Sequence, residues 1–283
     1  MAEQLKISNE KISVVISTMG AELKSVVKDG KELLWEGNPD VWAGQAPILF
    51  PICGGLKDGK FIFEGKEYTL PKHGYARMSE FEIESAERES ATFVLRSDEE
   101  SKKHYPFDYE FRVIYTLIDN KIKVDYSVKN VGSGDMYYSV GAHEAYACPE
   151  GIEEYSLVFD KEEDFKCNIL HGNLLGFDTY SVGKGRELEL KYDFFAKDAL
   201  TFLHLESRGV DLLHRPSGNK LRVEFDDSDY LFVWTKPNAN YICIEPWCGV
   251  PDFVDSDYDI TKKRGIIKLE ENAEKVLTHS IIL

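Results

Sequence analysis

The sequence predicts an all-β protein built from two packed antiparallel sheets. Three observations indicate this: apolar residues recur with a period of two between turn signals, helical periodicity is nearly absent, and no linker or low-complexity tract interrupts the 283 residues. With 43% hydrophobic residues, the chain can supply a large core. Because so many strands would leave exposed edges in one open sheet, we expect two packed sheets and a single domain over residues 1–283.

Two hairpins are predicted in the N-terminal half. Residues 61–70 contain two strand-like runs around Glu64 and Gly65. Residues 111–118 place alternate apolar side chains on one face, and after an Asp-Asn-Lys turn residues 122–128 alternate again. Each segment therefore predicts a pair of antiparallel strands joined by a short turn.

The C-terminal half predicts two further hairpins and one short helix. Residues 221–225 and 230–236 flank an Asp-Asp-Ser-Asp turn, which favours their pairing. Residues 265–283 are expected to close the fold with another hairpin. The best helical window, residues 193–200, is too short for more than two turns.

One carboxylate lies in an unusual context. Glu245 follows the strand-forming residues 241–244 and directly precedes Pro246. Since proline cannot donate to a strand ladder, we expect the strand to end there and to leave Glu245 at the rim of a sheet. Partial burial would raise the pKa of its carboxyl toward neutrality, which suits a general base.

Two of the seven histidines also lie in unusual settings. His73 occurs in LPKHGYAR and His143 in YYSVGAHEAYACP. His204 has apolar neighbours and is expected in the core with a satisfied ring nitrogen. The histidines expected at solvated positions are His104, His171, His214 and His279.

Charge and cysteine usage limit the possible partners and sites. The 34 basic and 50 acidic residues give a net charge of −16, which opposes binding to nucleic acid and to anionic membranes. Five cysteines and an N-terminus without an apolar signal region favour free thiols in the cytoplasm. Cys243 and Cys248 lack paired zinc-site spacing, so core packing is favoured over metal binding, and no cysteine occurs in a nucleophile motif.

Four motifs occur in an order that resembles the aldose 1-epimerase (galactose mutarotase) family, and most closely its LacX-like branch. They are APILFPICGGLKDGKF (46–61), LPKHGYAR (70–77), VGAHEAY (140–146) and CIEPW (243–247). The resemblance covers nearly the whole chain. It implies a large galactose mutarotase-like β-sandwich with a groove on a concave sheet face, a hexose or hexose phosphate as partner, and no metal or other cofactor.

The resemblance also implies roles for individual residues. By motif position, Glu245 is the general base, His143 is the general acid, and His73 holds the ring-oxygen end of the sugar. A histidine acid must be protonated, and we expect the neighbouring Glu144 to favour that state. The candidates for substrate binding are Arg77, Trp247, Trp234 and Lys57.

Other readings of these four residues stay open at this point. Arg77 could instead form a surface salt bridge, and either tryptophan could belong to the core. The chain departs from the family at Gly55, where relatives usually carry arginine, so Lys57 or Arg77 would have to replace that hydroxyl anchor. The sugar-binding aspartate of some mutarotases has no clear counterpart, and Asp252 is the nearest candidate.

Three functions therefore remain in competition. The first is an aldose 1-epimerase acting on free hexoses. The second is a hexose-6-phosphate mutarotase, whose phosphate would need cations such as Lys57, Lys72 and Arg77. The third is a non-catalytic sugar-binding or regulatory protein on the same fold, for which the missing arginine at Gly55 is the main support.

Overall fold

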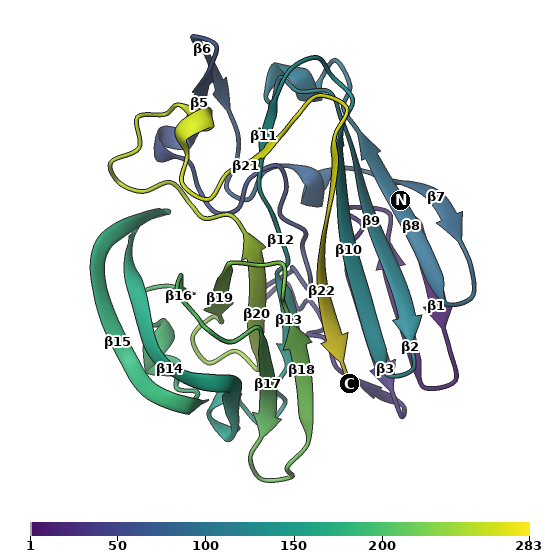
Figure 1. Cartoon of the computed structure of the whole chain (residues 1–283). Coiled ribbons are helices and arrows are strands. Elements are labelled where there is room, and N and C mark those ends of the chain that lie inside the picture. Colours follow the sequence, from purple (N-terminus) through teal and green to yellow (C-terminus); the bar gives the residue numbers. More distant parts are fainter. Residues whose placement is uncertain (1) are drawn as a thin grey trace.

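The computed structural model describes residues 2–283, and one large antiparallel sheet organises the molecule (Figure 1). In spatial order its main path contains β12 (Val140–Gly141), β20 (Tyr241–Cys248), β19 (Tyr230–Trp234), β16 (Leu200–Phe202), β14 (Tyr155–His171), β17 (Gly209–His214), β18 (Lys220–Glu224), β22 (Glu274–Ile282), β10 (Lys121–Asn130), β9 (Tyr109–Ile118), β8 (Ser90–Arg96) and β7 (Glu82–Ala86). Off this path, β13 (Glu144–Ala147) pairs with β20 and β15 (Leu174–Glu189) pairs with β14. The predicted all-β class is confirmed.

Smaller sheets and short 3₁₀ helices complete the architecture. A four-stranded sheet contains β1 (Gln4–Ser8), β2 (Ile12–Ser17), β3 (Leu23–Lys28) and β4 (Lys31–Glu32). Two-stranded sheets join β5 (Lys60–Phe63) to β6 (Lys66–Thr69) and β11 (Met136–Tyr138) to β21 (Ile267–Leu269). The 3₁₀ helices are η1 (Lys57–Gly59), η2 (Ala76–Met78), η3 (Ser101–Lys103), η4 (Ile152–Glu154), η5 (Tyr192–Phe195) and η6 (Ile260–Lys262). Within residues 2–283, no helix is both long and apolar enough to cross a membrane.

The two predicted N-terminal hairpins are confirmed. Strands β9 and β10 pair over their full lengths, with Ile118 opposite Lys121 at the turn. Strands β5 and β6 pair around the predicted turn, where Glu64 adopts a positive φ of 49° and Gly65 one of 75°. In both cases the period-two pattern and the turn residues lie next to each other in the sequence, so local information suffices.

The two C-terminal hairpins are wrong. Strand β18 pairs with β17 and β22, whereas β19 pairs with β16 and β20, so the acidic link between β18 and β19 joins separate parts of the sheet. Strand β18 instead forms a hairpin with the preceding strand β17, and β19 forms one with the following strand β20. Likewise β21 pairs with β11 and β22 with β10. Alternation identified these strands but carried no information about which neighbour each one would choose.

The helical window and one histidine also require correction. Only residues Tyr192–Phe195 are helical, as the 3₁₀ helix η5, and Leu200 already begins strand β16. His204, expected in the core, is exposed just after that strand. The apolar run at 200–203 is therefore a short strand that ends before His204, so its apolar neighbours do not enclose the ring.

The large sheet curls back on itself to form the predicted sandwich. Strands β13 and β22 are far apart in the sheet order, yet His279 Nε2 of β22 lies 2.9 Å from Glu144 Oε1 of β13. His279 is therefore buried in the core, not solvated as expected. One hydrophobic cluster extends from the N-terminal sheet through both layers, and all five cysteines are buried with free thiols.

Candidate active site

Strand β20 carries the candidate base and continues through it. Its side chains alternate between the sandwich core and the opposite face, which carries Tyr241, Cys243, Glu245 and Trp247. Glu245 is only 2% exposed and lies opposite Phe232 of β19. The expectation that the strand ends before Pro246, with Glu245 at a rim, is therefore wrong.

The strand tolerates Pro246 because a side chain replaces the missing backbone donor. Pro246 accepts a hydrogen bond from Ala142 N (3.0 Å), but it has no N–H to return to the carbonyl of Ala142. Trp247 supplies that bond instead, because its indole Nε1 donates to Ala142 O at 3.0 Å. The Glu-Pro-Trp sequence thus keeps the strand intact and fixes the backbone beside His143.

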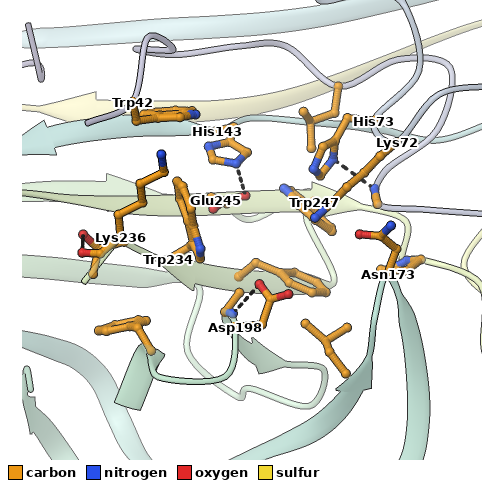
Figure 2. Close-up of a pocket in the computed structure, with 18 of the residues that line it drawn as sticks. Trp42, Lys72, His73, His143, Asn173, Asp198, Trp234, Lys236, Glu245 and Trp247 are labelled. Carbon is orange, nitrogen blue, oxygen red and sulfur yellow. Dashed lines mark hydrogen bonds and ion pairs between the residues drawn. The ribbon is translucent and has the colours of Figure 1, made fainter. Parts of the chain in front are cut away.

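His143 lies directly across from Glu245. In the register between β20 and its neighbours, Gly141 is opposite Trp247 and Glu144 is opposite Ile244, which places His143 opposite Glu245. Side chains at directly opposite positions on paired strands lie close enough to contact each other. Accordingly, His143 Nε2 lies 3.4 Å from Glu245 Oε2, and the dashed line in Figure 2 joins these two atoms.

Burial favours the uncharged form of both groups. Desolvation raises the pKa of the Glu245 carboxyl well above its usual value, although the positive charge of Lys72 opposes this effect. Desolvation also lowers the pKa of His143 to about 3. The expectation of a resting imidazolium supported by Glu144 is therefore wrong, because Glu144 points to the opposite face and contacts His279.

His73 reaches the same site through an unusual backbone conformation. It adopts a left-handed φ of 68°, which is uncommon for a residue other than glycine. Its Nδ1 accepts a hydrogen bond from Gly54 N at 3.1 Å, so the ring proton must be on Nε2. Burial holds the pKa of His73 well below its usual value, which makes this residue a neutral N–H donor.

The three residues meet in one cavity of about 550 Å³. Trp42 and Trp234 flank His143, with ring centroids 5.3 and 5.8 Å from the imidazole, and Trp247 lies edge-on to His73 at 5.5 Å (Figure 2). Apolar aromatic faces beside a few polar groups are typical of sugar-sized ligand sites. The structure therefore brings together the three predicted catalytic residues and both predicted tryptophans.

The predicted cations divide into two groups. Arg77 lines the cavity, and its Nη2 donates to the carbonyl of Lys72 at 3.1 Å. Lys57 does not line it, because its ammonium donates to Ser256 O at 3.0 Å and lies over the Tyr258 ring. Lys57 therefore cannot serve as the predicted substrate contact in this arrangement.

The position of Gly55 is explained by a neighbour that the sequence did not suggest. A Cβ added to Gly55 would come within 2.7 Å of Asn173 Cβ, so Asn173 fills the space that a larger side chain would need. Asn173 itself lines the cavity. Asp252, the guessed sugar-binding aspartate, instead forms a buried ion pair with Lys263 at 3.0 Å and lies outside the cavity lining.

Several polar or aromatic lining residues were missed by the sequence reasoning, and four of them bear on the site. They are Trp42, Asn173, Asp198 and Lys236 (Figure 2). Each comes from a connection between strands or from a strand end, and none belongs to the four motifs. Asp198, whose carboxylate accepts a hydrogen bond from Ala199 N at 2.8 Å, is the aspartate that the cavity offers in place of Asp252.

Comparison with known proteins gives a consistent result over nearly the full length. The family model for aldose 1-epimerase matches residues 3–274. The plasmid-encoded protein LacX of Lactococcus lactis subsp. lactis is 36% identical, and the match covers 94% of each chain. Among solved structures, a galactose mutarotase related enzyme from Lactobacillus acidophilus has a TM-score of 0.94 at 33% identity, covering 99% of this chain and 97% of that one. A galactose mutarotase-like protein from Lactobacillus casei has a TM-score of 0.93 at 27% identity, covering 99% of each chain.

Proposed function

Because the chain belongs to the aldose 1-epimerase family, we propose that it is a mutarotase that interconverts the α and β anomers of a hexose. The observation that carries the proposal is the contact between His143 Nε2 and Glu245 Oε2 at 3.4 Å inside a cavity lined by aromatic rings. Anomer exchange needs a base at O1 and an acid at the ring oxygen acting together. These two side chains can supply both.

The proposed reaction uses one proton that Glu245 and His143 share. Burial favours the resting form in which Glu245 is a neutral acid and His143 a neutral imidazole. Transfer of that proton across the contact creates a carboxylate base and an imidazolium acid. The carboxylate then takes the O1 proton while the imidazolium protonates the ring oxygen, and the C1–O5 bond opens to the aldehyde.

Ring opening therefore returns the buried pair to its uncharged state. Rotation about the C1–C2 bond presents the other carbonyl face, and the reverse proton transfers close the opposite anomer. His73 donates its Nε2 hydrogen to a sugar oxygen, and Trp247 and Trp234 provide apolar surfaces for the sugar ring. No proton is gained or lost over the cycle.

The decisive experiment is an NMR measurement of anomer exchange on glucose and galactose. We expect the purified protein to raise the rate of anomer exchange well above the rate in buffer, with His143 and Glu245 acting together. Binding of a sugar without any acceleration would contradict the proposal and support the non-catalytic alternative.

One observation favours a phosphorylated hexose as a second candidate substrate. Four cations line the cavity of this acidic protein, namely Lys72, Arg77, Lys197 and Lys236. None of them forms an ion pair with a carboxylate in the part of the chain that the structure describes. Figure 2 shows Lys72 extending past His73 toward Trp247, so its ammonium faces the ligand space.

The two substrates are distinguished by comparing kcat/KM for glucose and glucose 6-phosphate. If the phosphate is recognised, Lys72→Met should lower the preference for the phosphorylated sugar by about 10–100-fold, the worth of one hydrogen bond to a charged group. Lys57→Met is the matched control, because that ammonium binds Ser256 outside the cavity. Equal kcat/KM values for both sugars in the parent protein would favour the free hexose.

A further inference from the structure

A third potential metal ligand lies beside the catalytic pair. Cys243 precedes Glu245 by two positions in β20 and so shares its face of the sheet. One ligand atom from each of His143, Cys243 and Glu245 lies within 4.8 Å of the other two. Cys248 cannot join these three ligands, because its side chain points to the opposite face of the sheet and contacts Asp227 O.

The separation between His143 and Glu245 matches that of two ligands on a tetrahedral ion. Nitrogen and oxygen ligands at normal zinc distances lie about 3.3–3.5 Å apart, and His143 Nε2 and Glu245 Oε2 are already 3.4 Å apart. A thiolate ligand should lie about 3.6 Å from each of them, and one ligand atom of Cys243 lies within 4.8 Å of both. Ala145, the residue opposite Cys243 on β13, has only a methyl side chain.

The fourth coordination position would face the cavity. His143 and Glu245 both line the cavity, whereas Cys243, on the same face of β20, is fully buried and does not line it. An ion held by these three side chains would therefore have protein on three sides and solvent or a ligand on the fourth. That arrangement is typical of three-ligand zinc sites with one open position.

The charges also balance. A thiolate, a carboxylate and a neutral imidazole together carry two negative charges, which a divalent cation neutralises. Neither Cys243 nor Glu245 has an ion pair with lysine or arginine among residues 2–283. A bound cation would neutralise the negative charge that these two groups carry once their protons are released.

We propose that His143, Cys243 and Glu245 form a site for one zinc-like divalent cation, and that binding of this cation inhibits sugar turnover. The thiolate selects zinc over magnesium or calcium, which prefer oxygen ligands. Coordination uses the lone pairs of the two groups that would move protons, so bound metal and turnover exclude each other. The binding claim stands by itself, whereas the inhibition claim rests on the proposed mutarotase function.

Metal binding is tested first without any sugar. Zinc is titrated against a chromophoric chelator, and cobalt substitution is followed by thiolate-to-metal absorption. The parent protein should bind one ion, with affinity that rises with pH because ligand protons are released. Cys243→Ala and Cys243→Ser should weaken binding by more than about 100-fold, while Cys167→Ala, which removes another buried thiol, should not.

Inhibition is then measured by anomer exchange. Zinc should slow the parent enzyme, a chelator should restore its rate, and Cys243→Ala should keep its basal rate but lose zinc sensitivity. Thermal melting confirms that each variant is folded before it is compared. Absence of zinc binding, equal affinity for magnesium, or equal zinc inhibition of the parent and Cys243→Ala would overturn the site. If no sugar is turned over, the proposed function fails while the binding experiment still decides the metal site.

Discussion

Two buried histidine–glutamate pairs occupy opposite faces of the same part of the sheet. His143 and Glu245 face the cavity at 3.4 Å, whereas His279 and Glu144 lie in the sandwich core at 2.9 Å. His143 and Glu144 are consecutive residues, so strand alternation sends them to different faces. A histidine–carboxylate pair therefore does not define an active site, because only a pair with access to a ligand can exchange protons with it.

The core pair has a mechanical role instead. It joins β13 to β22, which are not neighbours in the sheet, and thereby ties the two layers together behind the cavity. Both side chains are at most 4% exposed. We therefore expect damage to the cavity pair to reduce turnover and damage to the core pair to reduce stability.

The largest effect is expected from Glu245→Gln. The amide preserves shape but cannot accept the proton, so exchange should fall by about 10²–10⁴-fold. Burial raises the pKa of Glu245 above its value in the unfolded chain. The protonated carboxyl therefore stabilises the folded protein at low pH, and this contribution is lost as the pH rises through the raised pKa. The variant should consequently melt no lower than the parent, and relatively higher at alkaline pH. Near-normal exchange with a lower melting temperature would reverse the assignment of the two pairs.

The opposite result is expected from His279→Leu. This change leaves Glu144 buried without its partner, which should lower the free energy of unfolding by about 3–5 kcal/mol. Denaturant titration measures that loss, and kcat/KM per folded molecule should stay within about threefold of the parent. A large loss of kcat/KM in fully folded protein would show that the core pair also acts on the reaction.

The pH dependence should sharpen the contrast further. The productive cavity pair holds one proton, so kcat/KM should fall on the acid side as a second proton binds and on the alkaline side as the last proton leaves. Since the pKa of His143 is lowered to about 3, the acid limb should lie far below the usual histidine range. The alkaline limb should follow the raised pKa of Glu245. An acid limb near pH 6.5 would contradict the burial argument.

The smallest effect is expected from Trp247→Phe. The phenyl ring can still stack on Phe232, whose ring lies 3.9 Å from the indole, but Ala142 O loses its donor. Loss of that bond should lower the free energy of unfolding by about 1–3 kcal/mol. Trp42→Phe provides a control, since Trp42 stacks on His143 without supporting that carbonyl.

The sequence predicted the fold class and three residues that line the cavity because both depend on local signals. Alternation along single strands gives the all-β class, and the motifs carry His73, His143 and Glu245. Pairing between distant strands, such as β22 with β18, was not predictable because alternation does not specify a partner. His279 was misassigned for the same reason, since its burial depends on β13, far away in the sequence.

The environment of Glu245 could not be predicted from its neighbours alone. Pro246 is ordinarily a sign that a strand ends, and only the position of the Trp247 indole shows why this strand continues. Asn173 and Asp198 enter the cavity from connections with no distinctive sequence. Long-range packing thus determined the burial of the candidate catalytic groups and much of the cavity wall.

The replacement of a backbone donor by the indole makes Pro246 and Trp247 epistatic. Trp247 supplies a hydrogen bond that is needed because residue 246 is proline. In a Pro246→Ala background a backbone N–H is restored, so Trp247→Phe should become less costly than it is beside proline. During evolution, Trp247 could therefore be replaced at low cost only after Pro246 had been replaced. The order of these two substitutions would limit which sequences the strand beneath the cavity can reach.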